Sequence, residues 1–301
     1  MNRIKARFAV KFLVVVLFLC CFSIYNIGAQ TERGVALQND SFLRFIQSEH
    51  RNVFIVILIF GMAFFFYLRH ARRGTELFLR PLPGLKAIEE AVGRATEMGK
   101  PVLYVPGLED IDEIQTLASL NILPYVAELT AEYGAPLIVT TRRSVVMSVA
   151  EEIVKEAHLR VGRPDTFNPN NIRYLSDEQF AFTAAIDGIM LREKPAANLY
   201  FGAFFAESLI LSETGFAAGA IQIAGTASAA QLPFFIAACD YTLIGEEFYA
   251  ASAYLSHEPT LLAGIKAADM LKIFILFAII AGVAAGSLGF TSIYDSIIVW
   301  F

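Results

Sequence analysis

The chain has 301 residues, a formal net charge of −5 at pH 7 and a hydrophobic fraction of 56%. This acidic balance argues against nucleic acid as a partner, because phosphate binding requires a basic face. The mean hydropathy of +0.54 lies above that of ordinary soluble domains and indicates embedded helices. The three cysteines, Cys20, Cys21 and Cys239, form neither a disulfide framework nor a metal-ligand spacing.

Three apolar segments, residues 12–29, 53–68 and 273–294, are predicted to span a membrane. A bilayer core of about 30 Å requires roughly 20 helical residues. The second segment reaches this length only if Arg51 and Arg69 extend their side chains along its ends. No Asp, Glu, Lys, Arg or His interrupts the three segments, which favours anchors over an ion or substrate pathway.

Residues 12–29 allow two interpretations. A basic stretch precedes them, and Ile27, Gly28 and Ala29 form a tolerable cleavage site, so the segment is either a retained anchor or a signal peptide. Basic residues also follow the second segment at 69–73, which places the next region in the cytoplasm. We therefore expect a multi-pass protein of the cell (inner) membrane.

The predicted division is an N-terminal membrane region over residues 1–73, a cytoplasmic domain over 74–272, and a C-terminal helix with a short tail over 273–301. Within the domain, short apolar runs alternate with helical patterns. Strands are expected at residues 102–105, 136–141, 172–175, 198–201, 220–224 and 241–244. Helices are expected at residues 85–98, 111–133, 144–160, 176–194, 204–213, 229–238 and 246–255. This alternation predicts an α/β fold with a parallel, doubly wound, Rossmann-like sheet.

Residues 196–245 carry few charges, namely Glu207, Glu213 and Asp240. The stretch is compatible with membrane helices, but its glycines divide it into strand-sized lengths, which favours buried strands and apolar helices. We expect the apolar surface of such helices to be buried against either a partner subunit or the membrane surface. The helix at 204–213 offers large apolar side chains for this contact, and the turn at 215–219 would let a neighbouring backbone approach. The side chains are Phe204, Phe205, Leu209 and Ile210.

A ligand site is expected beyond the carboxyl ends of the strands, where helix N-termini attract anions. The candidate residues of this anion cradle follow the second and fifth predicted strands. They are Thr140, Thr141, Arg142, Gly225, Thr226 and Ser228. The alternative interpretation is that these polar residues are helix caps.

Motifs for a nucleotide, a metal or a catalytic nucleophile are absent from the sequence. We therefore predict no cofactor and no metal, and an enzyme is the less favoured class. The two isolated histidines, His158 and His257, are predicted to be surface residues. Glutamates such as Glu207 and Glu213 are predicted to lie on solvated helix faces or caps.

Several stretches carry a resemblance to a known family. They are Arg-Glu-Lys-Pro-Ala-Ala-Asn at 192–198, Ala-Ile-Gln-Ile-Ala-Gly-Thr-Ala at 220–227, and the run from Gln231 to Glu247. From about Pro81 to the last apolar segment, the chain resembles an uncharacterised family of prokaryotic membrane proteins, a domain of unknown function. The resemblance implies a membrane protein and carries no activity, ligand or catalytic residue.

The function we expect is that of a membrane-anchored structural or assembly protein, either a homo-oligomer or a subunit of a larger membrane complex. The alternative is a membrane-tethered domain that binds or processes a small anionic ligand at the strand ends. The lipid bilayer is the partner common to both hypotheses.

Overall fold

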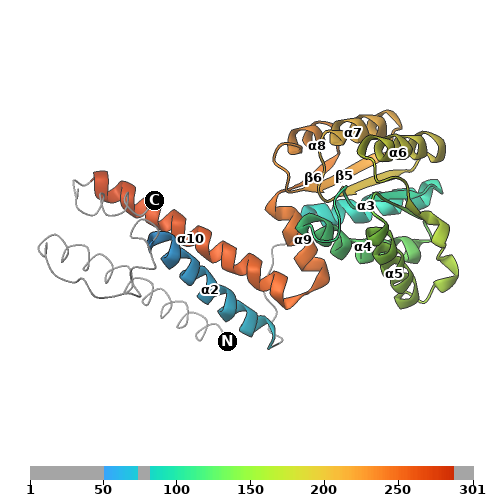
Figure 1. Cartoon of the computed structure of the whole chain (residues 1–301). Coiled ribbons are helices and arrows are strands. Elements are labelled where there is room, and N and C mark those ends of the chain that lie inside the picture. The colour runs from blue at the N-terminus through green and yellow to red at the C-terminus, as the bar shows by residue number, and fades with distance from the viewer. Residues whose placement is uncertain (1–50, 74–81, 288–301) are drawn as a thin grey trace, which may run out of the picture. The chain divides into compact units, whose positions relative to one another are not determined.

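The computed structural model describes residues 51–73 and 82–287 of the chain (Figure 1). The predicted segment at 12–29 and the end of the third segment lie outside the described residues. The chain divides into two compact units, Met1–Tyr67 with Lys266–Phe301, and Leu68–Ile265. The second unit is the α/β domain.

Six parallel strands form the sheet of the α/β domain. They are β1 (Val102–Val105), β2 (Leu137–Thr141), β3 (Ile172–Tyr174), β4 (Ala197–Phe201), β5 (Ile221–Thr226) and β6 (Tyr241–Ile244). Their spatial order is β3-β2-β1-β4-β5-β6, and every neighbouring pair is parallel. The order reverses between β1 and β4, as in doubly wound sheets. The predicted Rossmann-like α/β fold is confirmed.

Seven helices of this domain are described. They are α3 (Pro83–Met98), α4 (Ile114–Tyr133), α5 (Ser144–Arg160), α6 (Gln179–Glu193), α7 (Glu207–Ala217), α8 (Leu232–Ala238) and α9 (Glu246–Ser256). α5 has the predicted bounds, and α3 ends as predicted at Gly99, which is left-handed. α4 contains Pro124 and begins three residues later than predicted.

The helices cover both faces of the sheet. Figure 1 shows α6, α7 and α8 on one face and α3, α4, α5 and α9 on the other. Side chains of each strand alternate between the two cores, so Tyr104 joins the core under α3, α4, α5 and α9, while Leu103 joins the core under α6, α7 and α8. The central strands β1, β2, β4 and β5 are almost completely buried between the two cores, whereas the edge strands β3 and β6 are partly exposed.

The poorly charged stretch 196–245 forms β4, α7, β5, α8 and β6. The prediction of buried strands and apolar helices is confirmed, and the alternative of membrane helices is wrong. Helix α7 begins at Glu207, later than the predicted start at residue 204. Phe204 lies before the helix and is buried in the core. Gly215 is also buried inside α7, where it packs against Gln222 and Asn198, so a neighbouring chain has no access to it.

Two apolar helices flank the domain, α2 (Arg51–Ala71) and α10 (Pro259–Ser287). Among the described residues, one helix is long and apolar enough to cross a membrane, the part Pro259–Ala284 of α10. The second predicted segment is helical within α2, but its described apolar part, Val56–Ala71, is shorter than a full span. α10 begins well before the predicted residue 273, so one continuous helix runs from the domain into the apolar segment.

Candidate functional site

Doubly wound sheets bind ligands where the strand order reverses, which in this domain is between the carboxyl ends of β1 and β4. At this point the segment that follows β1 and the segment that follows β4 contact each other through main-chain atoms. The Leu108 amide donates to the Ala203 carbonyl at 2.9 Å. A Cβ atom on Gly202 would lie 2.5 Å from the Pro106 carbonyl oxygen. Main chain therefore fills the crevice in which this fold commonly binds a dinucleotide.

Glycine is required on both sides of this contact. Gly107 has φ +87° and Gly202 has φ +137°, and both values are unfavourable for residues with a Cβ atom. A Cβ atom on Gly107 would lie 2.8 Å from the Ala203 amide nitrogen. The two glycines thus allow the main chains of the β1 and β4 connections to meet at the reversal point, where a phosphate-binding loop would otherwise lie.

Of the first half of the predicted cradle, Thr140 and Thr141 are fully buried in β2. Their hydroxyl oxygens have no hydrogen-bond partner within the described part of the chain. The Arg142 guanidinium forms hydrogen bonds with main-chain carbonyls of the same domain. Nε donates to the Asp177 carbonyl at 2.8 Å, and Nη1 donates to the Leu108 carbonyl at 3.3 Å. Arg142 therefore ties together the connections that follow β1, β2 and β3.

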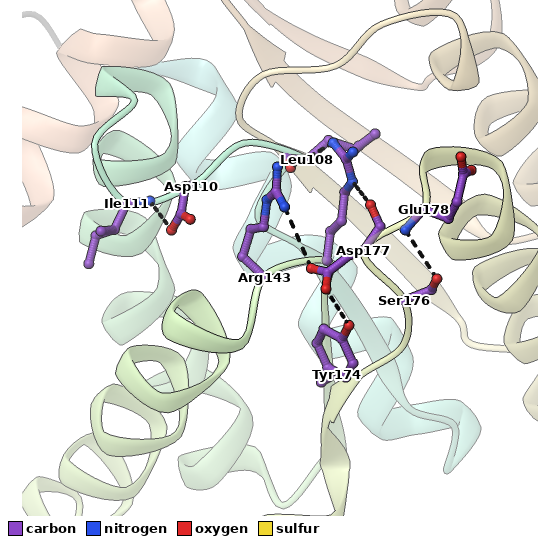
Figure 2. A network of polar contacts seen from close by, with 9 residues as sticks. Leu108, Asp110, Ile111, Arg143, Tyr174, Ser176, Asp177 and Glu178 are labelled. Atoms are coloured by element: carbon purple, nitrogen blue, oxygen red, sulfur yellow. Dashed lines mark hydrogen bonds and ion pairs between the residues drawn. The ribbon is translucent and has the colours of Figure 1, made fainter.

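Figure 2 shows a second set of contacts at the same edge, which converge on Asp177. Arg143 Nη1 lies 3.6 Å from one carboxylate oxygen, and the Tyr174 hydroxyl donates to the other at 2.9 Å. The hydrogen bond to Asp177 raises the pKa of the Tyr174 phenol above its ordinary value. These residues are partly or fully exposed, so the pairs add little to stability.

The second half of the cradle is the turn after β5, and Gln115 of α4 occupies it. Gln115 Oε1 accepts from the Ala227 amide at 2.8 Å and from the Thr226 hydroxyl at 3.2 Å. Gln115 Nε2 lies 3.5 Å from the Ser228 hydroxyl. Gly225 is a strand residue whose missing side chain makes room for the rings of Phe201 and Phe248. A neutral side chain thus takes a position that the sequence predicts for an anion.

The two halves of the predicted cradle do not form one site. β1 and β4 lie between β2, which ends at Thr141, and β5, which ends at Thr226. Three strand spacings separate the halves, which corresponds to about 14 Å. A small anion cannot contact both halves at once.

Two titratable residues lie in other surroundings than the sequence predicts. Glu207 is fully buried and accepts from the Phe205 amide at 2.6 Å and from the Gln179 side chain, so it fixes the start of α7. His158 is 6% exposed, and the prediction of a surface residue is wrong. His257, by contrast, is exposed. The burial of His158 follows from its place at the end of the buried side of α5.

The described residues provide neither a metal site nor a reactive thiol. No group of three or more His, Cys, Asp or Glu side chains in residues 51–73 and 82–287 could hold a metal ion. Burial raises the pKa of the Cys239 thiol to about 12, and Asp240 adds to the shift. A thiol with such a pKa stays protonated at neutral pH and is a poor nucleophile.

The most distinctive exposed feature of the domain is apolar. The large side chains Phe205, Leu209, Ile210, Phe216, Phe234 and Ile236 on α7, on α8 and just before α7 are all more than one third exposed, and we call this group the α7–α8 surface. Within α7, Leu209 and Phe216 lie on one side of the helix, because they are seven residues apart. Ser208 Oγ lies 2.7 Å from Gln231 Oε1 and links the start of α7 to that of α8.

A family model described as domain of unknown function (DUF6754) matches residues 42–297. The chain belongs to this family. No curated protein and no solved structure matches the chain. The match to DUF6754 includes both apolar helices, α2 and α10, and the complete sheet between them.

Charge distinguishes the α7–α8 surface from the other helices of this DUF6754 member. α5 carries Glu152, Lys155, Glu156 and Arg160 on its exposed side, and these residues form ion pairs along the helix. Residues 195–265 contain no Lys or Arg, and Glu213 is the only charge on the exposed side of α7. The α7–α8 surface is therefore poorly suited to contact with water, whereas the surface of α5 is well suited to it.

Proposed function

We propose that this protein is a membrane-anchored assembly module whose α/β domain associates with a second copy of the chain through the α7–α8 surface. The observation that supports the proposal is the group of six large apolar side chains on α7, on α8 and just before α7, with Glu213 as the only charge on the exposed side of α7. An exposed patch of this kind marks an interaction site in soluble proteins.

The free energy available from such a contact is sufficient. Burial of apolar surface contributes roughly 25 cal/mol per Å². A specific interface typically buries about 1,600 Å² in total, or about 800 Å² on each partner. Three phenylalanines, one leucine and two isoleucines supply the kind of side chains that dominate such interfaces. Anchoring in one membrane would also raise the effective concentration of the copies.

A second copy is favoured over the lipid surface because of the charge. Helices that lie on membranes carry Lys and Arg on their polar side, where these residues attract anionic headgroups. Residues 195–265 offer neither. A two-fold contact requires a surface that complements itself, and a nearly uncharged apolar surface meets this requirement with little like-charge repulsion.

The membrane part of the proposal depends on α10. Only 11% of its most apolar stretch is buried, unlike the core helix of a soluble protein, and the helix lies far from the N-terminus, unlike a signal sequence. Ile273, Phe277 and Val283 are exposed along it, as in a helix that faces lipid. We propose that α2 and residues 12–29 also engage the membrane and that the basic residues at 69–73 keep the domain in the cytoplasm.

Ligand binding at the strand ends is the second candidate and ranks below assembly. Main chain closes the reversal point, Gln115 occupies the turn after β5, and Arg142 donates to two carbonyl groups. An anion at this edge would have to displace at least one of these contacts.

The test is the mass of the full chain in lipid nanodiscs or mild detergent, measured for the wild type and two variants. Leu209→Asp places a charge in the α7–α8 surface, and Leu159→Asp places the same charge at an exposed position of α5. We expect a dimer or higher oligomer for the wild type and for Leu159→Asp. We expect a folded monomer for Leu209→Asp.

A wild-type protein that remains monomeric at all concentrations while folded would refute the assembly proposal. An oligomer that survives Leu209→Asp would place the contact elsewhere on the chain. A mass that corresponds to a complex with a different protein would replace self-association with hetero-assembly.

A further inference from the structure

A pocket of about 340 Å³ lies at the opposite edge of the sheet from the predicted cradle, at the amino ends of β2 and β3. Its size falls at the lower end of the range for small-molecule sites. Leu137 and Ile172, the first residues of the two strands, form part of the wall together with Val154 and Phe167. The polar side chains of the wall come from His158, Thr166, Asn168 and Asn171.

His158 is the chemically distinctive residue of this pocket. It is 6% exposed, and its Nδ1 lies 2.8 Å from the Val154 carbonyl oxygen. A carbonyl oxygen only accepts hydrogen bonds, so in the neutral ring Nδ1 carries the proton and Nε2 is an acceptor. The ring of Phe167 packs edge-on against the imidazole, with ring centres 5.8 Å apart. The ring is thus held in place with one acceptor nitrogen unused by the described residues.

The electrostatic surroundings favour a ligand that donates hydrogen bonds. α4 ends at Tyr133 and α5 ends at Arg160, so both helices direct their carboxyl ends, with partial negative charge, toward this edge of the sheet. No Lys, Arg, Asp or Glu lines the pocket within the described part of the chain. Arg163 lies nearby, where its Nη1 donates to the Glu132 carbonyl.

We propose that this pocket is a binding site for a small planar molecule that presents an N–H donor to His158 Nε2, as an aromatic amide does. The flat part of the ligand packs against Phe167, Val154 and Ile172, and the donor group reaches the imidazole. This site is independent of the α7–α8 surface and of the strand ends at the other edge.

Benzamide and benzoate are suitable probes, because the two molecules have nearly the same shape and differ in donor and charge. Ligand-observed NMR on the full chain in nanodiscs measures their binding, with empty nanodiscs as the blank. We expect benzamide to bind with a dissociation constant of about 1 mM, as is usual for a ligand of nine heavy atoms. Benzoate, which has no donor, should bind at least tenfold more weakly.

Two variants locate the binding. His158→Leu removes the acceptor, and Asn168→Trp places a large side chain at an exposed position of the pocket wall. Each should weaken benzamide binding at least tenfold, whereas His257→Leu, at an exposed histidine far along the sequence, should leave it unchanged. If His158→Leu unfolds, Asn168→Trp decides the question.

Three results would overturn the proposal. The first is the absence of benzamide binding to the wild type up to about 10 mM, well above the expected constant. The second is benzoate binding as tight as that of benzamide, which would indicate an anion site near Arg163. The third is unchanged benzamide binding in the folded Asn168→Trp variant.

Discussion

The carboxyl edge of the sheet and the α7–α8 surface differ in what they leave available to a partner. At the edge, the main chains of the β1 and β4 connections touch, and Arg142 and Gln115 are bonded to neighbouring segments. On the α7–α8 surface, large side chains such as Phe216 and Ile236 remain exposed, and Glu213 is the one charge on the exposed side of α7. In the first region Arg142 and Gln115 are bonded to the domain's own segments, although the buried Thr140 and Thr141 hydroxyls lack a partner among the described residues, whereas in the second region large apolar side chains remain exposed.

This difference shows that a doubly wound sheet can keep its topology while its usual ligand crevice is closed. The strand order sets where such a crevice lies. Whether the crevice is open depends on a few residues in the connections, here Gly107 and Gly202. In this DUF6754 protein the exposed apolar side chains lie on the outer helices α7 and α8 and just before α7.

The largest expected change in the free energy of unfolding comes from a variant that disturbs the contact between the β1 and β4 connections. Gly202→Ala would force a Cβ atom to within 2.5 Å of the Pro106 carbonyl oxygen at a φ of +137°. Strain and overpacking together should lower the free energy of unfolding by about 3 kcal/mol or more. Denaturant unfolding of the full chain measures this loss.

Gly219→Ala is the matched control for this experiment. Gly219 also has a positive φ, +74°, but a Cβ atom there would meet nothing within 4 Å. The loss should be about 1 kcal/mol, from backbone strain alone. Equal losses for the two variants would show that main-chain contact does not close the edge.

Smaller losses of the free energy of unfolding are expected for alanine variants of Arg142 and Arg143, and the two losses should differ. Arg142→Ala removes the hydrogen bonds to the Leu108 and Asp177 carbonyls and should cost about 1 to 2 kcal/mol. Arg143→Ala removes a long ion pair with an exposed carboxylate and should cost less than about 1 kcal/mol. Thermal unfolding without added anions distinguishes them. A loss for Arg142→Ala no larger than that for Arg143→Ala would mean that Arg142 is free for a ligand.

Much of the fold was predictable, because short apolar runs bounded by Gly and Pro form the strands. β1 follows Pro101 and precedes Pro106, and its bounds match the prediction. α5 was predictable from its periodicity, since Val146, Ala150, Val154 and His158 recur every four residues on its buried side. The same spacing is the signal from which the burial of His158 could have been inferred.

The candidate site was less predictable, because it depends on which strands are neighbours. Thr141 and Thr226 each end a strand, and the sequence does not reveal that two other strands separate them. The role of Gln115 depends on a contact with Ala227, more than a hundred positions along the chain. The inward position of Phe204 and the outward position of Phe205 likewise depend on where α7 begins.

The smallest predicted effect concerns Glu213, the one charge on the exposed side of α7. In a contact between two copies this carboxylate gains no cation, since residues 195–265 contain none. Glu213→Gln should therefore tighten self-association by a few fold, less than about 1 kcal/mol. Analytical ultracentrifugation over a concentration series measures the change. A clear weakening would point to a partner protein with a cation opposite Glu213.

Cysteine cross-linking in native membranes tests whether two copies of the chain meet through the α7–α8 surface. In a background in which Cys20, Cys21 and Cys239 are replaced by serine, single cysteines are placed at Leu209 and, as a control, at Leu159. We expect a disulfide-linked dimer for Leu209→Cys after mild oxidation and mainly monomer for Leu159→Cys. Monomer for both variants, or equal dimer for both, would contradict it.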